Sequence, residues 1–177
     1  MQSQSTVALR APEPSDLEFM LRLENDPAIW TFGDVHAPLS REALMQYLIT
    51  YDADPLRAGQ VRFVILSGAE AMGAVDLFNI DPYQRTAFVG IALLPGSRGR
   101  GYGSEALRKL VGYGRHHLGL EAIAATVSTE NPAGMRLFES CGFRRTGTLP
   151  AWRVSPGCPE RRCDVALLTL PFHHAQE

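Results

Sequence analysis

Residues 98–103 read Arg98-Gly99-Arg100-Gly101-Tyr102-Gly103, and this run decides the fold of the chain. An apolar stretch over residues 88–94 precedes it, and a segment with helical spacing of apolar residues begins near Ser104. A strand, a glycine-rich turn and a helix aim unpaired backbone N–H groups at an anion, because the first helical turn has free donors and a positive dipole end. Glycines let the backbone approach a ligand, and the two arginines add positive charge. We therefore predict a phosphate site at this turn.

The spacing of the glycines excludes two common phosphate loops. A P-loop places Lys and then Ser or Thr after its last glycine, whereas Gly103 is followed by Ser104 and Glu105. The dinucleotide fingerprint needs Gly-x-Gly-x-x-Gly, whereas the glycines alternate in this run. The pattern that fits is Arg/Gln-x-x-Gly-x-Gly/Ala, which Arg98, Gly101 and Gly103 satisfy.

A second segment, residues 131–143, carries its own structural signals. Asn131 suits the N-cap of a short helix, Pro132 suits its first position, and Gly142 suits its end. The apolar run over residues 121–128 that precedes it predicts a strand. Strand, Asn and helix thus follow strand, glycines and helix, as expected of two neighbouring parallel strands.

Together the two segments resemble the GNAT superfamily of acetyl-CoA-dependent N-acetyltransferases, whose pyrophosphate loop and Asn-helix-Gly-Phe motif they match. The resemblance implies that CoA lies in the splay between the two strands, with acetyl-CoA as co-substrate. It also implies that a backbone N–H of the central strand meets the thioester oxygen, and that the pantetheine arm pairs with this strand. The residues implied in binding acetyl-CoA are Ile91, Ala92, Leu93, Arg98, Gly99, Arg100, Gly101, Tyr102, Gly103, Ser104, Asn131 and Phe138.

The opening segment sharpens the resemblance. Residues 9–17 look like the start of the branch that holds spermidine/diamine and ribosomal-protein N-terminal acetyltransferases, and residues 24–30 and 73–78 are more similar to the polyamine side. This implies acetyl transfer to a primary amine, on a small molecule such as a polyamine or diamine. The alternatives are a protein N-terminal or lysine acetyltransferase, and a non-catalytic acetyl-CoA-binding homologue. Dimers are common in this branch, so a homodimer is one expected assembly.

The whole chain predicts an α/β fold. We expect a single GNAT-like domain over residues 1–177, with its core at about 6–170: a mixed, largely antiparallel sheet with a splayed central parallel strand pair, flanked by helices. A capping box at residues 15–18 predicts a helix to about Asn25, and Ser40 is expected to cap a second helix. The expected strands cover residues 6–10, 61–67, 72–80, 86–94, 121–128, 143–154 and 162–170.

Composition adds bounds on location and partners. No apolar run is long enough to span a bilayer, and the first residues lack the regions of a signal peptide. Cys141, Cys158 and Cys163 leave one thiol over and form no zinc-like pairing, which favours a reducing interior and no metal. A formal net charge of -2 argues against non-specific nucleic-acid binding. The expectation is a cytoplasmic protein without membrane or nucleic-acid partners.

The proton donor is where this chain departs from the resemblance. Acetyl transfer needs an unprotonated amine, a polarised thioester carbonyl and a proton for the departing thiolate. Many relatives carry a Tyr in the Asn-helix that protonates the sulfur, but that position is Phe138, which has no proton to give. The remaining alternatives are that another side chain or a water molecule protonates the sulfur, or that CoA leaves as a thiolate. This substitution keeps the non-catalytic alternative open.

The candidates for a base or for amine binding are acidic residues on the substrate side: Glu24, Asp34, Asp76 and Asp81. Asp76 is preferred because it interrupts an apolar strand next to the central one, so it is either paired and structural or lines a cleft. Asp34 lies in an early loop near Trp30, where polyamine-acetylating relatives place acidic residues, and its alternative is a solvated loop residue. Asp34 and Asp76 are therefore the predicted acceptor-binding residues.

Overall fold

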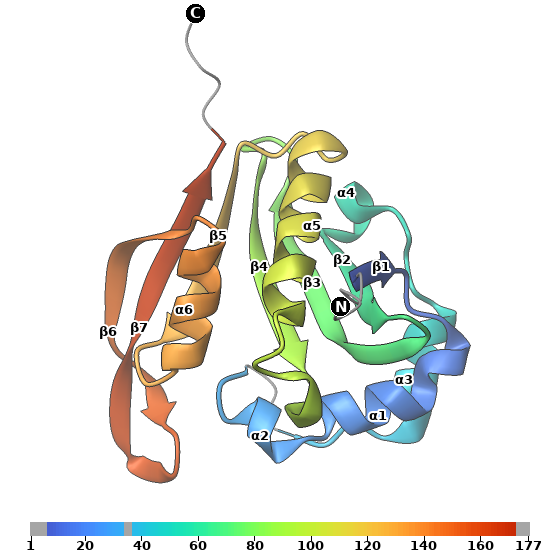
Figure 1. Ribbon diagram of the computed structural model, residues 1–177, viewed down its shortest axis with the longest axis horizontal. Helices are drawn as coiled ribbons and strands as arrows, with labels where there is room; N and C mark the ends of the chain where they lie inside the picture. Colours follow the sequence, from blue (N-terminus) through green and yellow to red (C-terminus); the bar gives the residue numbers. More distant parts are fainter. Residues whose placement is uncertain (1–6, 34–36, 173–177) are drawn as a thin grey trace, which may run out of the picture.

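The computed structural model describes residues 7–33 and 37–172, which form one seven-stranded sheet with helices on both faces (Figure 1). The strand order is β1-β2-β3-β4-β5-β7-β6, and every neighbouring pair is antiparallel except the parallel pair β4–β5. The strands are β1 Val7–Arg10, β2 Gln60–Ser67, β3 Glu70–Asp81, β4 Thr86–Leu93, β5 Ala122–Ser128, β6 Arg144–Ser155 and β7 Cys158–Pro171. The predicted fold class is confirmed.

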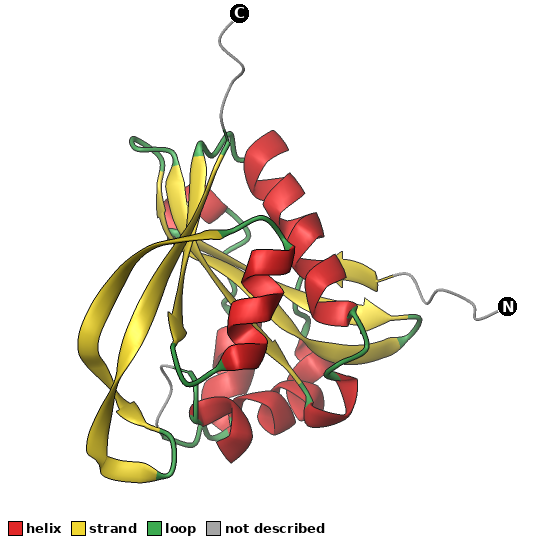
Figure 2. Cartoon of the chain, turned by 60° about the vertical axis from the view of Figure 1, so that its left-hand side comes forward, coloured by secondary structure: helices red, strands yellow, loops and turns green. Residues whose placement is uncertain are grey.

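In the described part of the chain, four α-helices lie between β1 and β2, and two more follow β4 and β5. The α-helices are α1 Leu17–Glu24, α2 Pro27–Trp30, α3 Arg41–Ile49, α4 Pro55–Ala58, α5 Tyr102–His116 and α6 Pro132–Ser140, and short 3-10 turns cover Pro14–Asp16 and Pro95–Ser97. Figure 2 shows α5 and α6 crossing the sheet, with the β6–β7 hairpin extending from it as an arm. None of the helices in the described ranges is long and apolar enough to cross a membrane.

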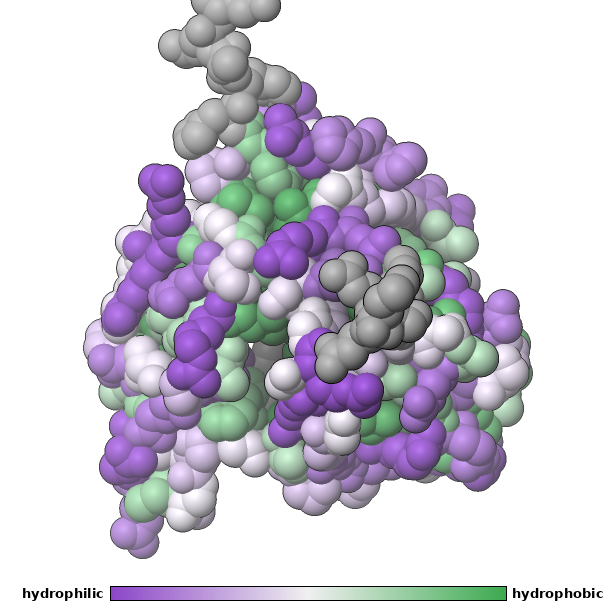
Figure 3. Space-filling view, in the orientation of Figure 1, coloured by the Kyte–Doolittle hydropathy of each residue, from purple (hydrophilic) through white to green (hydrophobic). Residues whose placement is uncertain are grey.

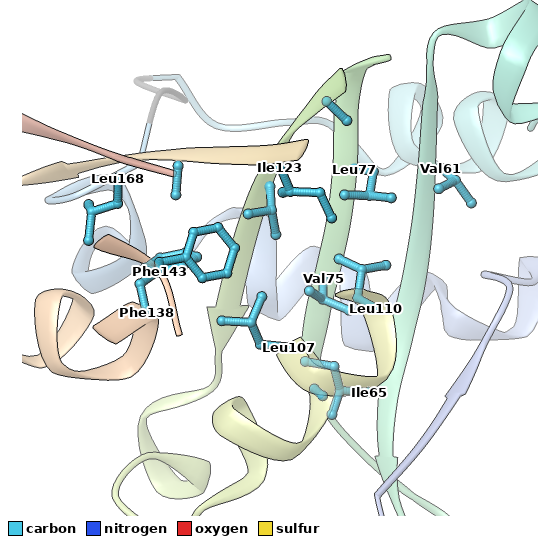
Figure 4. Close-up of a cluster of buried hydrophobic side chains, with 14 of the residues drawn as sticks. Val61, Ile65, Val75, Leu77, Leu107, Leu110, Ile123, Phe138, Phe143 and Leu168 are labelled. Carbon is cyan, nitrogen blue, oxygen red and sulfur yellow. The ribbon is translucent and has the colours of Figure 1, made fainter. Parts of the chain in front are cut away.

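Two apolar clusters hold the helices against the sheet. The larger lies between the sheet and the helices α5 and α6, and Figure 4 shows its centre around Val75, Leu110 and Ile123, each at most 1% exposed. The smaller lies on the opposite face, where Met20 and Leu44 of α1 and α3 pack on the strands. Burying one such side chain contributes roughly 1.5–3 kcal/mol. β3 contributes side chains to both clusters, because successive side chains along a strand point to opposite faces of the sheet.

The central parallel pair separates after a short ladder. β4 and β5 are in register only from Thr86↔Ala122 to Phe88↔Ala124, although β4 continues to Leu93 and β5 to Ser128. Beyond this ladder β4 stays paired with β3, and β5 stays paired with β7. The expected splay is therefore present, and among the described residues no strand pairs with the second half of β4 on the β5 side.

Several predicted boundaries are wrong. The capping box forms at Glu13 and Asp16 instead of at residues 15–18, because the Asp16 carboxylate accepts the Glu13 N–H at 2.7 Å and pairs with Arg10. Arg10, through these hydrogen bonds, holds the pKa of Asp16 below its usual range. α5 begins at Tyr102, earlier than expected, because Gly101 is already its N-cap.

Two further corrections concern short elements. Pro27 starts a short helix, α2, that was not among the predicted elements, and the final hairpin turns over two residues, 156–157, where a longer loop was expected. Both α2 and α4 have an Asp N-cap followed by Pro, a helix-starting pair that was present in the sequence.

Candidate active site

The glycine turn after β4 is built for an approaching ligand. Gly99 and Gly101 have φ of +72° and +85°, in the left-handed region that disfavours any residue with a Cβ. A Cβ at either position would meet no heavy atom within 4 Å, so these glycines are needed for backbone conformation, and open space lies beside them. Gly101 caps α5, whose first N–H groups have no partner within the helix. The turn therefore presents free donors to open space.

The third glycine of the run has a different role. A Cβ on Gly103 would lie 3.3 Å from Leu93 Cδ1 and 3.4 Å from Leu137 Cδ1, so its absence lets α5 approach both β4 and α6. The two arginines flank the turn. Arg98 donates from Nε to the Leu93 carbonyl at 3.1 Å, and the Arg100 guanidinium lies 5.1 Å from the Tyr102 ring centre. Positive charge is therefore held at the end of β4 and at the start of α5.

Beyond its ladder with β5, β4 points the backbone groups of two residues toward the gap between the two strands. The Leu94 N–H donates to Met72 of β3 at 2.9 Å, and backbone groups alternate along an antiparallel pair, so Ala92 also faces β3. Gly73 supports this, because its Cβ position is 2.1 Å from the Ala92 carbonyl oxygen. Ile91 and Leu93 therefore turn their N–H and C=O groups toward β5. Ala92 departs from the expectation that its backbone faces the cofactor.

The space-filling surface is hollowed at the same place. Figure 3 shows the hollow between α6 and the C-terminal end of β4, which is where β4 and β5 have separated. One side of this hollow is lined by α6, whose N-cap is Asn131; the Asn131 Oδ1 accepts the Gly134 N–H at 2.9 Å. The predicted N-cap role of Asn131 is thus confirmed.

Phe138 belongs to the hydrophobic core. It is 6% exposed and packs edge-on against Phe143 with ring centres 5.2 Å apart (Figure 4). A phenyl ring in this setting can shape the wall of the hollow but has no proton to transfer. Cys141, one helical turn further on, points its thiol at the Ser104 carbonyl at 3.6 Å.

An ion cluster lies on the face of the sheet opposite α5. Arg62 of β2 pairs through Nε with Asp76 Oδ1 at 2.5 Å and through Nη1 with Glu24 Oε1 at 2.7 Å. The three side chains are 12–25% exposed. A Cβ on Gly90 of β4 would lie 4.0 Å from Asp76 Oδ2, so the cluster borders β4 where it has left β5. We call Glu24, Arg62 and Asp76 the carboxylate–arginine cluster.

Two phenols surround the arginine of this cluster. The Tyr51 hydroxyl lies 2.8 Å from the Arg62 backbone N, and the Tyr47 ring centre is 5.8 Å from the guanidinium carbon. Burial raises the pKa of Tyr47 to about 12, and it raises the pKa of Tyr51 as well. Burial alone would lower the pKa of Arg62, but the charges of Asp76 and Glu24 more than offset it and raise this pKa. Arg62 is thus a permanent cation between two carboxylates.

The sequence candidates are not all brought together. Asp76 and Glu24 meet at Arg62, whereas Asp81 accepts the N–H groups of Tyr83 and Gln84 in the turn after β3. Asp34 lies outside the described residues. Sequence reasoning missed Arg62, although it interrupts an apolar strand just as Asp76 does.

No group of three or more His, Cys, Asp or Glu that could hold a metal ion occurs in the ranges described above.

Two features together define the acetyl-CoA-dependent N-acetyltransferases. A central pair of parallel strands separates, and a glycine-rich turn beside it leads into the N-terminus of a helix. The chain belongs to the GNAT family of these enzymes: the family described as "Acetyltransferase (GNAT) domain" matches residues 6–144. Acetyl-CoA is the co-substrate of this family, which agrees with the free donors of the turn and the unpaired half of β4.

Known relatives extend the comparison. Spermidine N(1)-acetyltransferase of Vibrio cholerae is 30% identical over 146 residues, covering 82% of this chain and 83% of the relative. A crystal structure of spermidine N-acetyltransferase from Vibrio cholerae in complex with CoA and spermine superposes with a TM-score of 0.84, at 26% identity over 95% of this chain and 96% of that one. A dodecameric structure of that enzyme matches with a TM-score of 0.76, at 26% identity over 95% of each chain.

Proposed function

We propose that this protein transfers the acetyl group of acetyl-CoA to a primary amine of a small polyamine. The observation that carries the proposal is the carboxylate–arginine cluster, which leaves one net negative charge beside the open half of β4. An aliphatic polyamine is cationic at neutral pH, and a half-buried negative site attracts it more strongly than an exposed one does. The similarity to enzymes that act on spermidine supports the same acceptor class.

The proposed cofactor site follows from the backbone. The donors at residues 101–104, with Arg98 and Arg100, would bind the pyrophosphate of acetyl-CoA. The pantetheine arm would pair with Ile91 and Leu93 as an added strand, and one of their N–H groups would polarise the thioester carbonyl. In this arrangement the side chain of Phe138 shields the thioester from the α6 side, and Asn131 acts only through its helix cap.

The chemistry is one addition and one elimination. The nitrogen lone pair attacks the thioester carbon, the C–N bond forms, and the C–S bond breaks as the sulfur takes the electron pair. The bound ammonium loses one proton before the attack and a second after it, and the thiolate gains one, giving the N-acetylated amine, free CoA and one proton released to solvent. We assign to Asp76 the role of holding the amine, and of accepting its proton directly or through water.

The acceptor panel tests the proposal. Release of free thiol from acetyl-CoA would be measured with spermidine, spermine, putrescine, an aminoglycoside and a short peptide with a free N-terminus. Acetyl-CoA binding would be measured by calorimetry alongside. We expect turnover with the polyamines at the highest kcat/KM.

Each other result of the panel has a definite meaning. Turnover confined to the peptide supports the N-terminal acetyltransferase alternative and refutes the polyamine assignment. Acetyl-CoA binding without any turnover supports the non-catalytic alternative that Phe138 keeps open. The homodimer stays a prediction, and its molar mass in solution distinguishes it from a dodecamer such as that of the structural neighbour.

A further inference from the structure

Arg153 joins two parts of the chain that are distant in sequence. It lies on β6, in the arm, and its Nη1 donates to the Phe32 carbonyl at 2.7 Å and lies 3.4 Å from the Gly33 carbonyl. Those carbonyls belong to the turn that follows α2. The arm and the early helices are therefore bridged, although they flank the opening of the sheet from opposite sides (Figure 1).

The face on which Arg153 lies follows from its register. Arg153 is paired with Cys163 of β7, and the Cys163 thiol is 3.3 Å from the Ser128 hydroxyl at the end of β5. Paired residues in an antiparallel ladder share a face, so Arg153 and Ser128 lie on one face. Val127, the neighbour of Ser128, faces the core beneath α5 and α6. The bridge is therefore on the opposite face, which is also the face of Asp76.

The contacts on this face close into a ring. From β4 the sheet pairing leads to β5, then to β7 and to Arg153 on β6. The Arg153 bridge leads to the α2 turn, and Trp30 Nε1 donates to the Glu24 carbonyl of α1 at 2.6 Å. Glu24 then returns through Arg62 and Asp76 to β3 and β4. The ring thus encloses the acceptor side of the gap, with the carboxylate–arginine cluster on its edge.

We propose that Arg153 determines acceptor size by closing this ring, so that a thin, flexible amine can reach the thioester and an amine on a folded protein cannot. The inference rests on the proposed function, because the ring surrounds the proposed amine site. Sheet pairing and the partly buried ion pairs of the carboxylate–arginine cluster hold most of the ring in place. Arg153 contributes side-chain hydrogen bonds to carbonyl oxygens, which one substitution removes. Arg153 is a positioning residue here, since it acts through the α2 turn and not on the reacting atoms.

The test compares two acceptors in three variants. Arg153→Met keeps the side-chain length and removes the donors, Arg153→Lys restores charge and one donor, and Arg144→Met changes an exposed arginine at the other end of β6. The acceptors are spermidine and the surface lysines of cytochrome c. Thiol release gives kcat and KM for each pair, and thermal unfolding checks that each variant is folded.

We expect Arg153→Met to raise the ratio of kcat/KM for cytochrome c over spermidine about tenfold, as expected when a charge-assisted hydrogen bond is lost. The KM for spermidine should rise while its kcat stays within about twofold. Arg153→Lys should recover part of the ratio, and Arg144→Met should leave it unchanged. If Arg153→Met does not fold, an intermediate ratio in Arg153→Lys supports the ring, and a wild-type ratio overturns it.

The failures are distinguishable. Wild-type turnover of spermidine with an unchanged ratio in both Arg153 variants overturns the ring and leaves the proposed function standing. An equal change of the kcat/KM ratio in Arg144→Met also overturns the ring proposal, because the change would then be caused by the loss of a surface charge. Wild-type protein that acetylates no amine in either assay overturns the proposed function and the ring with it.

Discussion

Gly101→Ala tests the phosphate turn with the smallest available change. Gly101 has φ of +85° at the N-cap of α5, and a Cβ there would meet nothing within 4 Å. The substitution therefore adds conformational strain without a clash. A non-glycine residue in this left-handed region costs about 1–2 kcal/mol.

The strain can be expressed in two ways. If the turn keeps its conformation, the free energy of unfolding falls by about 1–2 kcal/mol. If the turn relaxes, the first N–H groups of α5 move away from the ligand, and the strain is converted into a loss of acetyl-CoA affinity of up to about 30-fold. We expect the second outcome in large part, because no heavy atom lies within 4 Å of the added Cβ to hold the substituted residue in the strained conformation. Gly101→Glu adds a negative charge beside the pyrophosphate and should abolish binding.

Gly119 offers a matched control. It has φ of +66° with nothing within 4 Å of its Cβ position, and it lies beyond the other end of α5. Gly119→Ala should lose about the same unfolding free energy and keep the acetyl-CoA Kd. Calorimetric titration with acetyl-CoA and denaturant unfolding measure the two quantities. The phosphate-turn assignment is refuted if folded Gly101→Ala and Gly101→Glu both bind acetyl-CoA as tightly as the wild type.

Three further substitutions test other parts of the site and fold. Phe138→Tyr puts a phenol where many relatives carry the proton donor, so kcat for thiol release should rise at least about tenfold, and an unchanged kcat with intact cofactor binding would contradict the donor argument. Asp76→Asn should raise the KM for spermidine about tenfold, lower kcat at least about tenfold and leave the acetyl-CoA Kd alone, while Asp81→Asn, in the turn, should change none of these. Arg10 lowers the pKa of Asp16, so this pair stabilises the fold above the usual aspartate pKa and loses its effect as pH falls through the lowered value. Unfolding free energies of wild type and Asp16→Asn should accordingly differ by about 1–2 kcal/mol at pH 7, and the difference should begin to shrink only below about pH 4 and vanish once the pH lies below the lowered pKa; a constant difference down to that pH would exclude the ion pair as the cause.

Local signals predicted the central elements well. The apolar runs before Ser104 and Asn131 became β4 and β5, and the caps at Ser40 and Asn131 formed as expected, because each depends on residues within one or two turns. The misplaced capping box shows where such signals fail. The predicted box paired Ser15 with Glu18, but the Asp16 carboxylate accepts the Glu13 N–H and pairs with Arg10 of β1, so the box formed at Glu13 and Asp16.

The acceptor side could not be predicted in the same way. Glu24 and Arg62 are separated by 38 positions, and Arg153 and Phe32 by 121, so no local pattern connects them. What the sequence did contain was a pair of opposite charges, Arg62 and Asp76, each inside an apolar strand of the same hairpin. Cross-strand pairing of such charges is the physical rule that could have placed them together.

The three-pair ladder between β4 and β5 gives this sheet an interior edge. Beyond Phe88 the described structure shows β4 with a strand on one side only, so the amide protons of Ile91 and Leu93 should exchange rapidly with deuterium in the free protein, despite their place in the middle of seven strands. An exposed edge elsewhere would invite strands of other molecules, but here the edge lies beside the hollow between β4 and α6, inside the sheet (Figure 3). The chain thus keeps an edge that can accept an added strand, while the position of this edge inside the sheet limits pairing with strands of other molecules.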